Sequence, residues 1–172
     1  LKVLSGEPEE EFEVIFHIMG QQRMPVLLGV REFKARKHIF VTGGDYGAEV
    51  MKKFVKAGAW SEIAVNAFDP MMVKMALLKE AAKLPEGVKV GFNLTGGTKL
   101  MFVGALAACR KIGGVPFYFE TNRHRLIFLQ DYTQRVPRGV EDCESFLSLH
   151  GFDVLTPGKW EDVPLREKRA SM

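Results

Sequence analysis

The run of residues with the clearest chemical potential is Thr95-Gly96-Gly97-Thr98-Lys99, which combines two glycines, two hydroxyls and a lysine. It follows an apolar, strand-like stretch that ends with Asn93 and Leu94, and it precedes a helical pattern. At such a junction, free backbone N–H groups and the positive end of the helix dipole attract anions. Glycines let a ligand approach the backbone, Thr95 and Thr98 can donate hydrogen bonds, and Lys99 adds a positive charge. The segment from Asn93 therefore predicts a phosphate-binding loop; the alternative is a capped helix start with a solvent-exposed lysine.

A second polar loop, Gly20-Gln21-Gln22-Arg23, follows the apolar stretch Phe12–Met19. The amides of Gln21 and Gln22 are donors and acceptors suited to base edges or ribose, and Arg23 is suited to phosphate. We interpret this loop as a second part of a nucleotide site, with solvated loop residues as the alternative.

A related sequence, Thr42-Gly43-Gly44, ends another apolar stretch. Asp45 stands there where Thr98 stands in the later copy, and a carboxylate repels phosphate. We therefore expect Thr42 and Gly43 to contact sugar or base. The alternative is a helix N-cap.

Other reactive residue types show no pattern typical of catalysis. The four histidines and two cysteines lack metal-ligand or disulfide spacing, and no serine lies in a G-x-S-x-G motif. A Walker A loop is excluded because Gly97, and not lysine, follows Gly96. We expect no metal and no cofactor, and no catalytic residue for a reaction of this chain's own.

Composition and charge limit the class of protein further. The net charge of +3 over 172 residues is too small for general nucleic-acid binding, so an anion site must be local and no direct DNA binding is expected. The longest apolar stretch, Leu100–Cys109, is half of the roughly 20 residues that cross a bilayer. An acidic start and two unpaired cysteines favour a cytoplasmic protein that does not bind membranes.

Strand-like and helix-like stretches alternate along the first 131 residues. The strands are expected at 12–19, 38–42, 62–67, 88–94, 115–120 and 126–130, with helices at 25–36, 45–57, 70–84 and 99–112. Nearly continuous apolar strands indicate a mostly parallel sheet covered on both faces. The predicted fold is Rossmann-like α/β, with about six strands in the order 3-2-1-4-5 and an antiparallel edge strand. Ligands bind such sheets where the strand order reverses, here between strands one and four, next to both glycine loops.

The chain is expected to divide near residue 131. Residues 1–131 form the Rossmann-like domain, and residues 132–172 are interpreted as a linker and the start of a C-terminal extension. Pro137 and Gly139 break the pattern before a helix-like segment, Val140–His150.

The segment from Asn93 to Met101 resembles the signature of the CRISPR-associated Rossmann-fold sensor domains, or CARF domains. The resemblance covers roughly Phe12 to Gln130 and is greatest to sensors fused to nucleases in type III CRISPR antiviral defence. It implies a homodimer that binds a cyclic oligoadenylate, most simply cyclic tetra-adenylate, and regulates a fused nuclease that is missing from this chain. By the same resemblance, the residues from Thr95 to Lys99 would hold phosphate and ribose, and the loop from Gly20 would face the nucleotide.

Two other functions remain open. One is a metal-independent ring nuclease that cleaves the cyclic ligand, in which Lys99 and Thr98 would be catalytic. The other is a transcription regulator of the CARF type. The sequence does not decide between ring sizes of the ligand.

Overall fold

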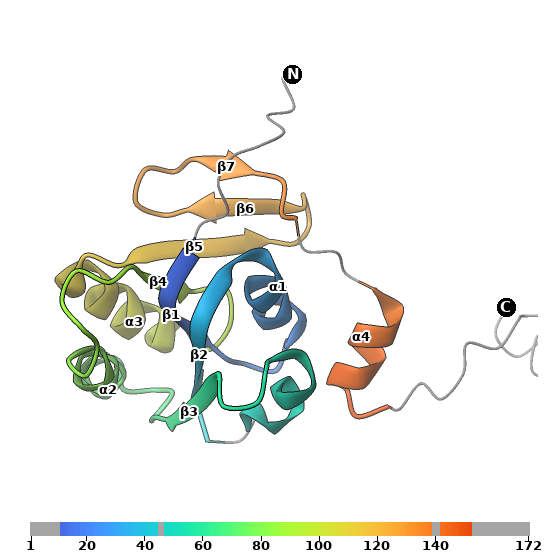
Figure 1. Cartoon of the computed structure of the whole chain (residues 1–172), viewed down its shortest axis with the longest axis horizontal. Coiled ribbons are helices and arrows are strands. Elements are labelled where there is room, and N and C mark those ends of the chain that lie inside the picture. Colours follow the sequence, from blue (N-terminus) through green and yellow to red (C-terminus); the bar gives the residue numbers. More distant parts are fainter. Residues whose placement is uncertain (1–10, 45–46, 139–141, 153–172) are drawn as a thin grey trace, which may run out of the picture. The chain divides into compact units, whose positions relative to one another are not determined.

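The computed structural model describes residues 11–44, 47–138 and 142–152. Within these ranges, strands and helices alternate up to α3 and three strands follow (Figure 1). The elements are β1 (Glu11–Ile18), α1 (Met24–Glu32), β2 (Lys34–Thr42), the 3₁₀ helix η1 (Ala48–Phe54), β3 (Trp60–Ala64), α2 (Pro70–Ala81), β4 (Val90–Asn93), α3 (Lys99–Ile112), β5 (Val115–Glu120), β6 (Arg125–Phe128), β7 (Gln134–Arg135) and α4 (Cys143–Leu149).

The strands of the described residues form one sheet in the order β3-β2-β1-β4-β5-β6-β7. The first five strands of this order are parallel to their neighbours, whereas β6 and β7 are added in antiparallel fashion. The predicted fold class is thus confirmed, including the strand order and the antiparallel edge. The sequence does not predict β7, because two residues are too few to show a period.

Helices cover both faces of the sheet. On one face, α2 and α3 bury Val73, Leu77 and Met101 in a cluster that includes Phe16 of β1 and Phe92 of β4. On the other face, side chains of α1, β5 and β6 form a second cluster. Both faces are therefore apolar, which explains why the central strands lack a polar-out alternation.

The helix that follows the glycine loop has clear end signals. The Oγ1 of Thr98 accepts a hydrogen bond from the backbone N–H of Met101 at 3.1 Å, and Gly113 ends the helix with a left-handed φ of 67°. Gly104 faces α2, where an added Cβ would overlap the Pro70 carbonyl oxygen. This glycine therefore serves the close packing of α3 on α2.

The bounds of α1, β2, η1 and β3 differ most from the sequence prediction, and β3 covers Trp60–Ala64 instead of 62–67. The helix predicted to reach residue 36 ends at Glu32, and β2 starts at Lys34 instead of His38. Lys34 and Arg36 are exposed at the start of β2, where β2 pairs with β1 but not yet with β3, so their charges resemble a helix end. The helix predicted for 45–57 is the shorter η1, and the predicted cap at residue 45 lies outside the described residues.

The chain forms two compact units, residues 1–141 and 142–172, and the whole sheet belongs to the first. In the second unit, the described part of the predicted helix is α4, which starts after Asp142. The carboxylate of Asp142 accepts a hydrogen bond from the Ser145 N–H at 2.7 Å. Residues 139–141 and 153–172, which belong to the predicted linker and extension, lie outside the described residues.

Candidate functional site

A cleft of about 450 Å³ opens at the carboxyl ends of β1 and β4, where the strand order reverses. Eight of the residues predicted to bind ligand line it: Gly20, Gln21, Gln22, Gly43, Thr95, Gly96, Gly97 and Thr98. The structure thus brings the three predicted loops together at one place. Four other predicted residues, Arg23, Thr42, Asn93 and Lys99, are not part of its lining.

The loop after β1, which begins at Gly20, and the loop after β4, which begins at Thr95, touch through their backbones. A Cβ added at Gly20 would lie 2.9 Å from the backbone nitrogen of Gly97, and one added at Gly96 would overlap the carbonyl oxygen of Ile18. Gly97 also has a φ of 72°, which side chains rarely adopt. These glycines therefore bring the two loops into contact, and they leave the cleft lined by backbone as well as side chains.

The hydroxyl of Thr98 is engaged at the start of α3. It accepts from the Met101 N–H and donates to the carbonyl oxygen of Ala67, in the segment after β3. Thr98 thus joins α3 to the segment after β3, which also lines the cleft through Ala67. Since the first turn of α3 carries no acidic residue, the positive end of this 14-residue helix lies at the cleft without a neutralising carboxylate.

Lys99 is the first residue of α3 and is exposed. It directly follows the cleft residue Thr98 and carries its ammonium group on a long, flexible stem. This placement is compatible with a contact to a ligand that extends beyond one cleft. Catalysis by Thr98 is less well supported, because its hydroxyl already donates and accepts within the protein.

Thr95 and Asn93 form a hydrogen-bonded support behind the cleft. The Thr95 Oγ1 donates to Asn93 Oδ1 at 2.7 Å and accepts from the backbone N–H of Phe119 at 2.9 Å. The Asn93 side chain is fully buried, so it does not face the cleft. Both residues shape the loop, and Thr95 alone of the two lines the site.

Thr42 and Gly43 have different environments. Thr42 is 1% exposed and donates to Glu62 Oε1 at 2.8 Å, which joins β2 to β3. Gly43 lines the cleft, and an added Cβ there would lie 2.8 Å from the Cβ of Ala67. Of this predicted pair, only Gly43 is thus placed to meet a ligand. Arg23 is half-buried at the N-cap position of α1.

Sequence reasoning missed the apolar part of the site. Met19, Ala67, Phe68 and Met101 also line the cleft. Phe68 is 75% exposed, so its ring is free to stack on a planar group. An aromatic residue between Asn66 and Asp69, just past β3, is the signal that could have pointed to it, because that position lies at the ligand-binding edge of a parallel sheet.

Two histidines, His17 and His38, lie buried, and His17 is next to Asn93. The Nε2 of His17 and the Nδ1 of His38 are 2.9 Å apart, on neighbouring strands. Burial, and then the nearby His38, hold the pKa of His17 well below 6.5. Burial lowers the pKa of His38 to about 4. Both rings are therefore neutral at physiological pH.

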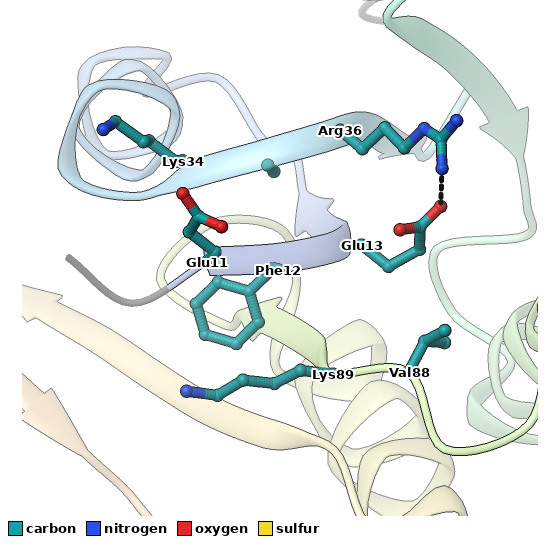
Figure 2. Close-up of a pocket in the computed structure, with 8 residues that line it drawn as sticks. Glu11, Phe12, Glu13, Lys34, Arg36, Val88 and Lys89 are labelled. Atoms are coloured by element: carbon teal, nitrogen blue, oxygen red, sulfur yellow. Dashed lines mark hydrogen bonds and ion pairs between the residues drawn. The ribbon is translucent and has the colours of Figure 1, made fainter. Parts of the chain in front are cut away.

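A second hollow, of about 470 Å³, lies at the opposite, amino ends of β1 and β2 (Figure 2). Its charged groups have partners nearby: Arg36 pairs with Glu13 at 3.4 Å, and the Lys89 ammonium lies 4.9 Å from the centre of the Phe12 ring. None of the residues predicted to bind ligand lines it. Although it is slightly larger, its mixed charges make it a weaker candidate for an anion site than the cleft.

Comparison with solved structures finds the same fold in several known proteins. Can2 from Sulfobacillus thermosulfidooxidans, solved in complex with cyclic tetra-adenylate, matches 94% of this chain and 45% of its own length, with 16% identity and a TM-score of 0.72. A type III CRISPR defence DNA nuclease activated by cyclic oligoadenylate matches 87% of this chain and 25% of its own, with 22% identity and a TM-score of 0.62.

The protein VC1899 from Vibrio cholerae also shares the fold, with 18% identity, a TM-score of 0.67, and coverage of 80% of this chain and 39% of its own. This chain spans less than half the length of each of these proteins. At the level of fold, the likenesses confirm the resemblance to the CARF sensor domains.

No model of a known protein family matches the chain, and no curated protein does. Within the part of the chain that the structure describes, no helix is both long and apolar enough to span a membrane. Over those same residues, no group of three or more histidine, cysteine or acidic side chains could hold a metal ion.

Proposed function

We propose that this chain is a sensor domain that binds a cyclic oligoadenylate in the cleft at the carboxyl ends of β1 and β4. The observation that carries the proposal is the meeting of two glycine loops and the positive end of α3 at the point where the strand order reverses. Shared fold with proteins that bind or respond to cyclic oligoadenylates supports the ligand class. We further propose that the sensor acts in type III CRISPR antiviral defence and that it is located in the cytoplasm.

Different groups of the cleft would contact different parts of the ligand. Backbone N–H groups near Gly96 and Gly97, with Lys99 next in the chain after Thr98, suit phosphate. The amides of Gln21 and Gln22 suit ribose or base edges. The exposed ring of Phe68 suits stacking on adenine, a contact that would not depend on base-edge hydrogen bonds.

A ring of four nucleotides is larger than one cleft, so we propose that two subunits share one ring. A site of about 450 Å³ lies near the lower end of the range for ligand pockets, roughly 300–1,000 Å³. A two-fold axis would present equivalent clefts to the two halves of a tetra-adenylate. This geometry is the reason for preferring cyclic tetra-adenylate within the class.

The surface that would form the dimer lies on α2 and α3. The methionine face, as we name it, consists of the exposed apolar side chains of α2, of the first half of α3 and of the residue Phe68 just before α2. They are Phe68, Met71, Met72, Met75, Leu100 and Val103, at 40–75% exposure. Phe68 belongs to this face and also lines the cleft, so a second copy on the face would lie beside the site. The sequence suggests Met24, Leu28, Met101 and Ala105 for this contact. Leu28, Met101 and Ala105 are buried within their own subunit, so of these four only the half-buried Met24 has surface to offer.

Regulation of a fused nuclease would need a mechanical connection from the cleft to the rest of the protein. Helix α1 starts directly after the first cleft loop and ends at Glu32, whose buried carboxylate pairs with Arg135 and accepts the backbone N–H of Arg138 at 2.6 Å. We propose that a shift of the first loop reaches the segment after β7 through this helix.

A thermal-shift panel tests the proposed function. Cyclic tri-, tetra- and hexa-adenylate are compared with linear tetra-adenylate at equal concentration, since a ligand that binds only the folded state raises Tm by mass action. We expect the largest shift with cyclic tetra-adenylate and little with the linear control. Absence of a shift with every cyclic ligand would contradict the proposal. Chromatography of the ligand after long incubation separates binding from ring cleavage.

A further inference from the structure

The carboxamide of Asn93 uses all of its hydrogen-bonding capacity beneath the cleft. Its Oδ1 accepts from the backbone N–H of Thr95 at 3.2 Å and from the Thr95 hydroxyl at 2.7 Å. Its Nδ2 donates to the carbonyl oxygen of Pro25 at 3.0 Å and faces Nδ1 of His17 at 3.3 Å. The side chain is fully buried, so water cannot replace any of these partners.

These contacts set the proton positions of the neighbouring histidines. Because Nδ2 of Asn93 can only donate, Nδ1 of His17 must accept. The ring proton of His17 is then on Nε2, where it donates to Nδ1 of His38. The N–H of Thr95 in turn holds the amide in one orientation, since a flipped Asn93 would turn its NH₂ group toward that N–H.

The same side chain joins elements from both sides of the cleft. Thr95 lines the cleft and passes the network to β5 through the N–H of Phe119. Pro25 lies in the first turn of α1, immediately after the loop that begins at Gly20. Asn93 thus ties the start of α1 to the glycine loop, although Asn93 and Pro25 are 68 residues apart in the chain.

We propose that Asn93 is a positioning residue, which holds the two cleft loops in the arrangement that binds ligand without touching the ligand itself. The inference rests on the proposed function for its ligand. It assigns to Asn93 a different role from the direct contact that the sequence suggests. The backbones of the two loops meet at Gly20 and Gly97, so a displacement of one loop would also move the other.

Gly29 offers a way to disturb this network from outside the cleft. An added Cβ would overlap Nδ2 of Asn93 and lie 3.1 Å from Cε1 of His17. In an ordinary helix, glycine to alanine is stabilising. Here the methyl group would push on the amide, and Gly29 is not among the residues that line the cleft.

The experiment compares Asn93→Asp, Gly29→Ala and a control, Leu77→Ala, in the full chain. Leu77 is buried between α2 and the sheet, so its truncation lowers Tm without a contact to the network. Affinity for cyclic tetra-adenylate is measured well below Tm, and backbone amide signals of Thr95 and Phe119 are followed by NMR. We expect Asn93→Asp and Gly29→Ala to weaken binding by about tenfold or more and to shift both signals. The control should stay within about twofold of wild type.

A pH series separates positioning from general loss of structure. The carboxylate introduced by Asn93→Asp cannot donate to Pro25 or to Nδ1 of His17. It accepts a hydrogen bond from a protonated Nδ1, and its negative charge stabilises the charged form of the His17 ring. Besides Asn93, His38 of β2 and Gly29 of α1 face His17. Affinity of the Asn93→Asp variant should therefore recover at least about threefold from pH 8 to pH 6, while wild type stays level.

Wild-type affinity in both variants, with shifted Thr95 and Phe119 signals, would overturn the inference. Equal losses in Leu77→Ala would overturn it too. If the wild-type chain binds no cyclic oligoadenylate, the proposed function fails separately. The inference is then decided by NMR in the ligand-free protein: shifts at Thr95 and Phe119 in Gly29→Ala but not in Leu77→Ala support it, and unchanged signals contradict it.

Discussion

The backbones of Gly20 and Gly97 lie so close that a Cβ on Gly20 would come within 2.9 Å of the Gly97 nitrogen. These residues are 77 positions apart in the chain, yet they belong to loops after the neighbouring parallel strands β1 and β4. The contact places backbone from two strand ends in one cleft. It also makes the cleft sensitive to the addition of a single methyl group.

Gly20→Ala should destabilise the protein and weaken ligand binding together. The added methyl group has to displace the glycine loop, at a cost of about 1–3 kcal/mol. Gly47→Ala is the matched control, because no atom lies within 4 Å of the corresponding Cβ position. Urea unfolding of both variants is the measurement. Equal stability of the two would show that the loops separate without cost.

Lys99→Ala should weaken binding of cyclic tetra-adenylate by more than tenfold at unchanged or slightly higher Tm. Charge-assisted contacts to phosphate are worth about 1.5–3 kcal/mol each, and a shared ring would meet two copies of the lysine. Removal of a positive charge from the first turn of α3 also relieves an unfavourable interaction with the helix dipole. Lys111→Ala, at the other end of α3, is the control for charge alone. Identical affinities in calorimetry would remove Lys99 from the site.

Stability should fall as the pH is lowered from 7 to 5. The pKa of His38 is about 4 when folded and near 6.5 when unfolded, so the unfolded chain binds more protons in this window. The free energy of unfolding then falls by about 2 kcal/mol because of His38 alone. His17, whose pKa is also lowered, adds to the fall in the same direction. Urea unfolding at several pH values measures this slope. A flat profile above pH 5 would mean that the buried pair accepts a proton without cost.

Met71→Glu should convert the proposed dimer to a monomer. Met71 is 60% exposed on the methionine face, and a carboxylate at an apolar contact is costly to bury. Light scattering gives the mass in solution. Lys111→Glu introduces the same charged group at the far end of α3 and should leave the mass at that of the dimer. A wild-type chain that is monomeric even with ligand would argue against a shared site.

Fold and location of the cleft follow from the sequence because both depend on local signals. Apolar runs of strand length, capping residues and glycine loops identify the alternation, and the order of a parallel sheet then brings the loops at Gly20 and Thr95 together. The structure agrees on strand order and on the residues of both loops that line the cleft. Direct contact of these residues with ligand stays a prediction.

Side-chain direction could not be predicted in the same way. Thr42 and Asn93 are polar residues at strand ends, which is where ligand contacts are expected, but both are buried in hydrogen bonds within the protein. The partners of Asn93 are Pro25 and His17, which are far away in sequence and have no motif in common. Phe68 is missed for the opposite reason, because an exposed aromatic side chain has no periodic signature.

Isothermal titration calorimetry of the wild-type chain with cyclic tetra-adenylate tests the central proposal most directly. It reports affinity and stoichiometry in one measurement, without a label or a variant. The proposed sensor should bind one ring per two chains. No binding, or one ring bound to each single chain, would contradict a cleft shared across a two-fold axis.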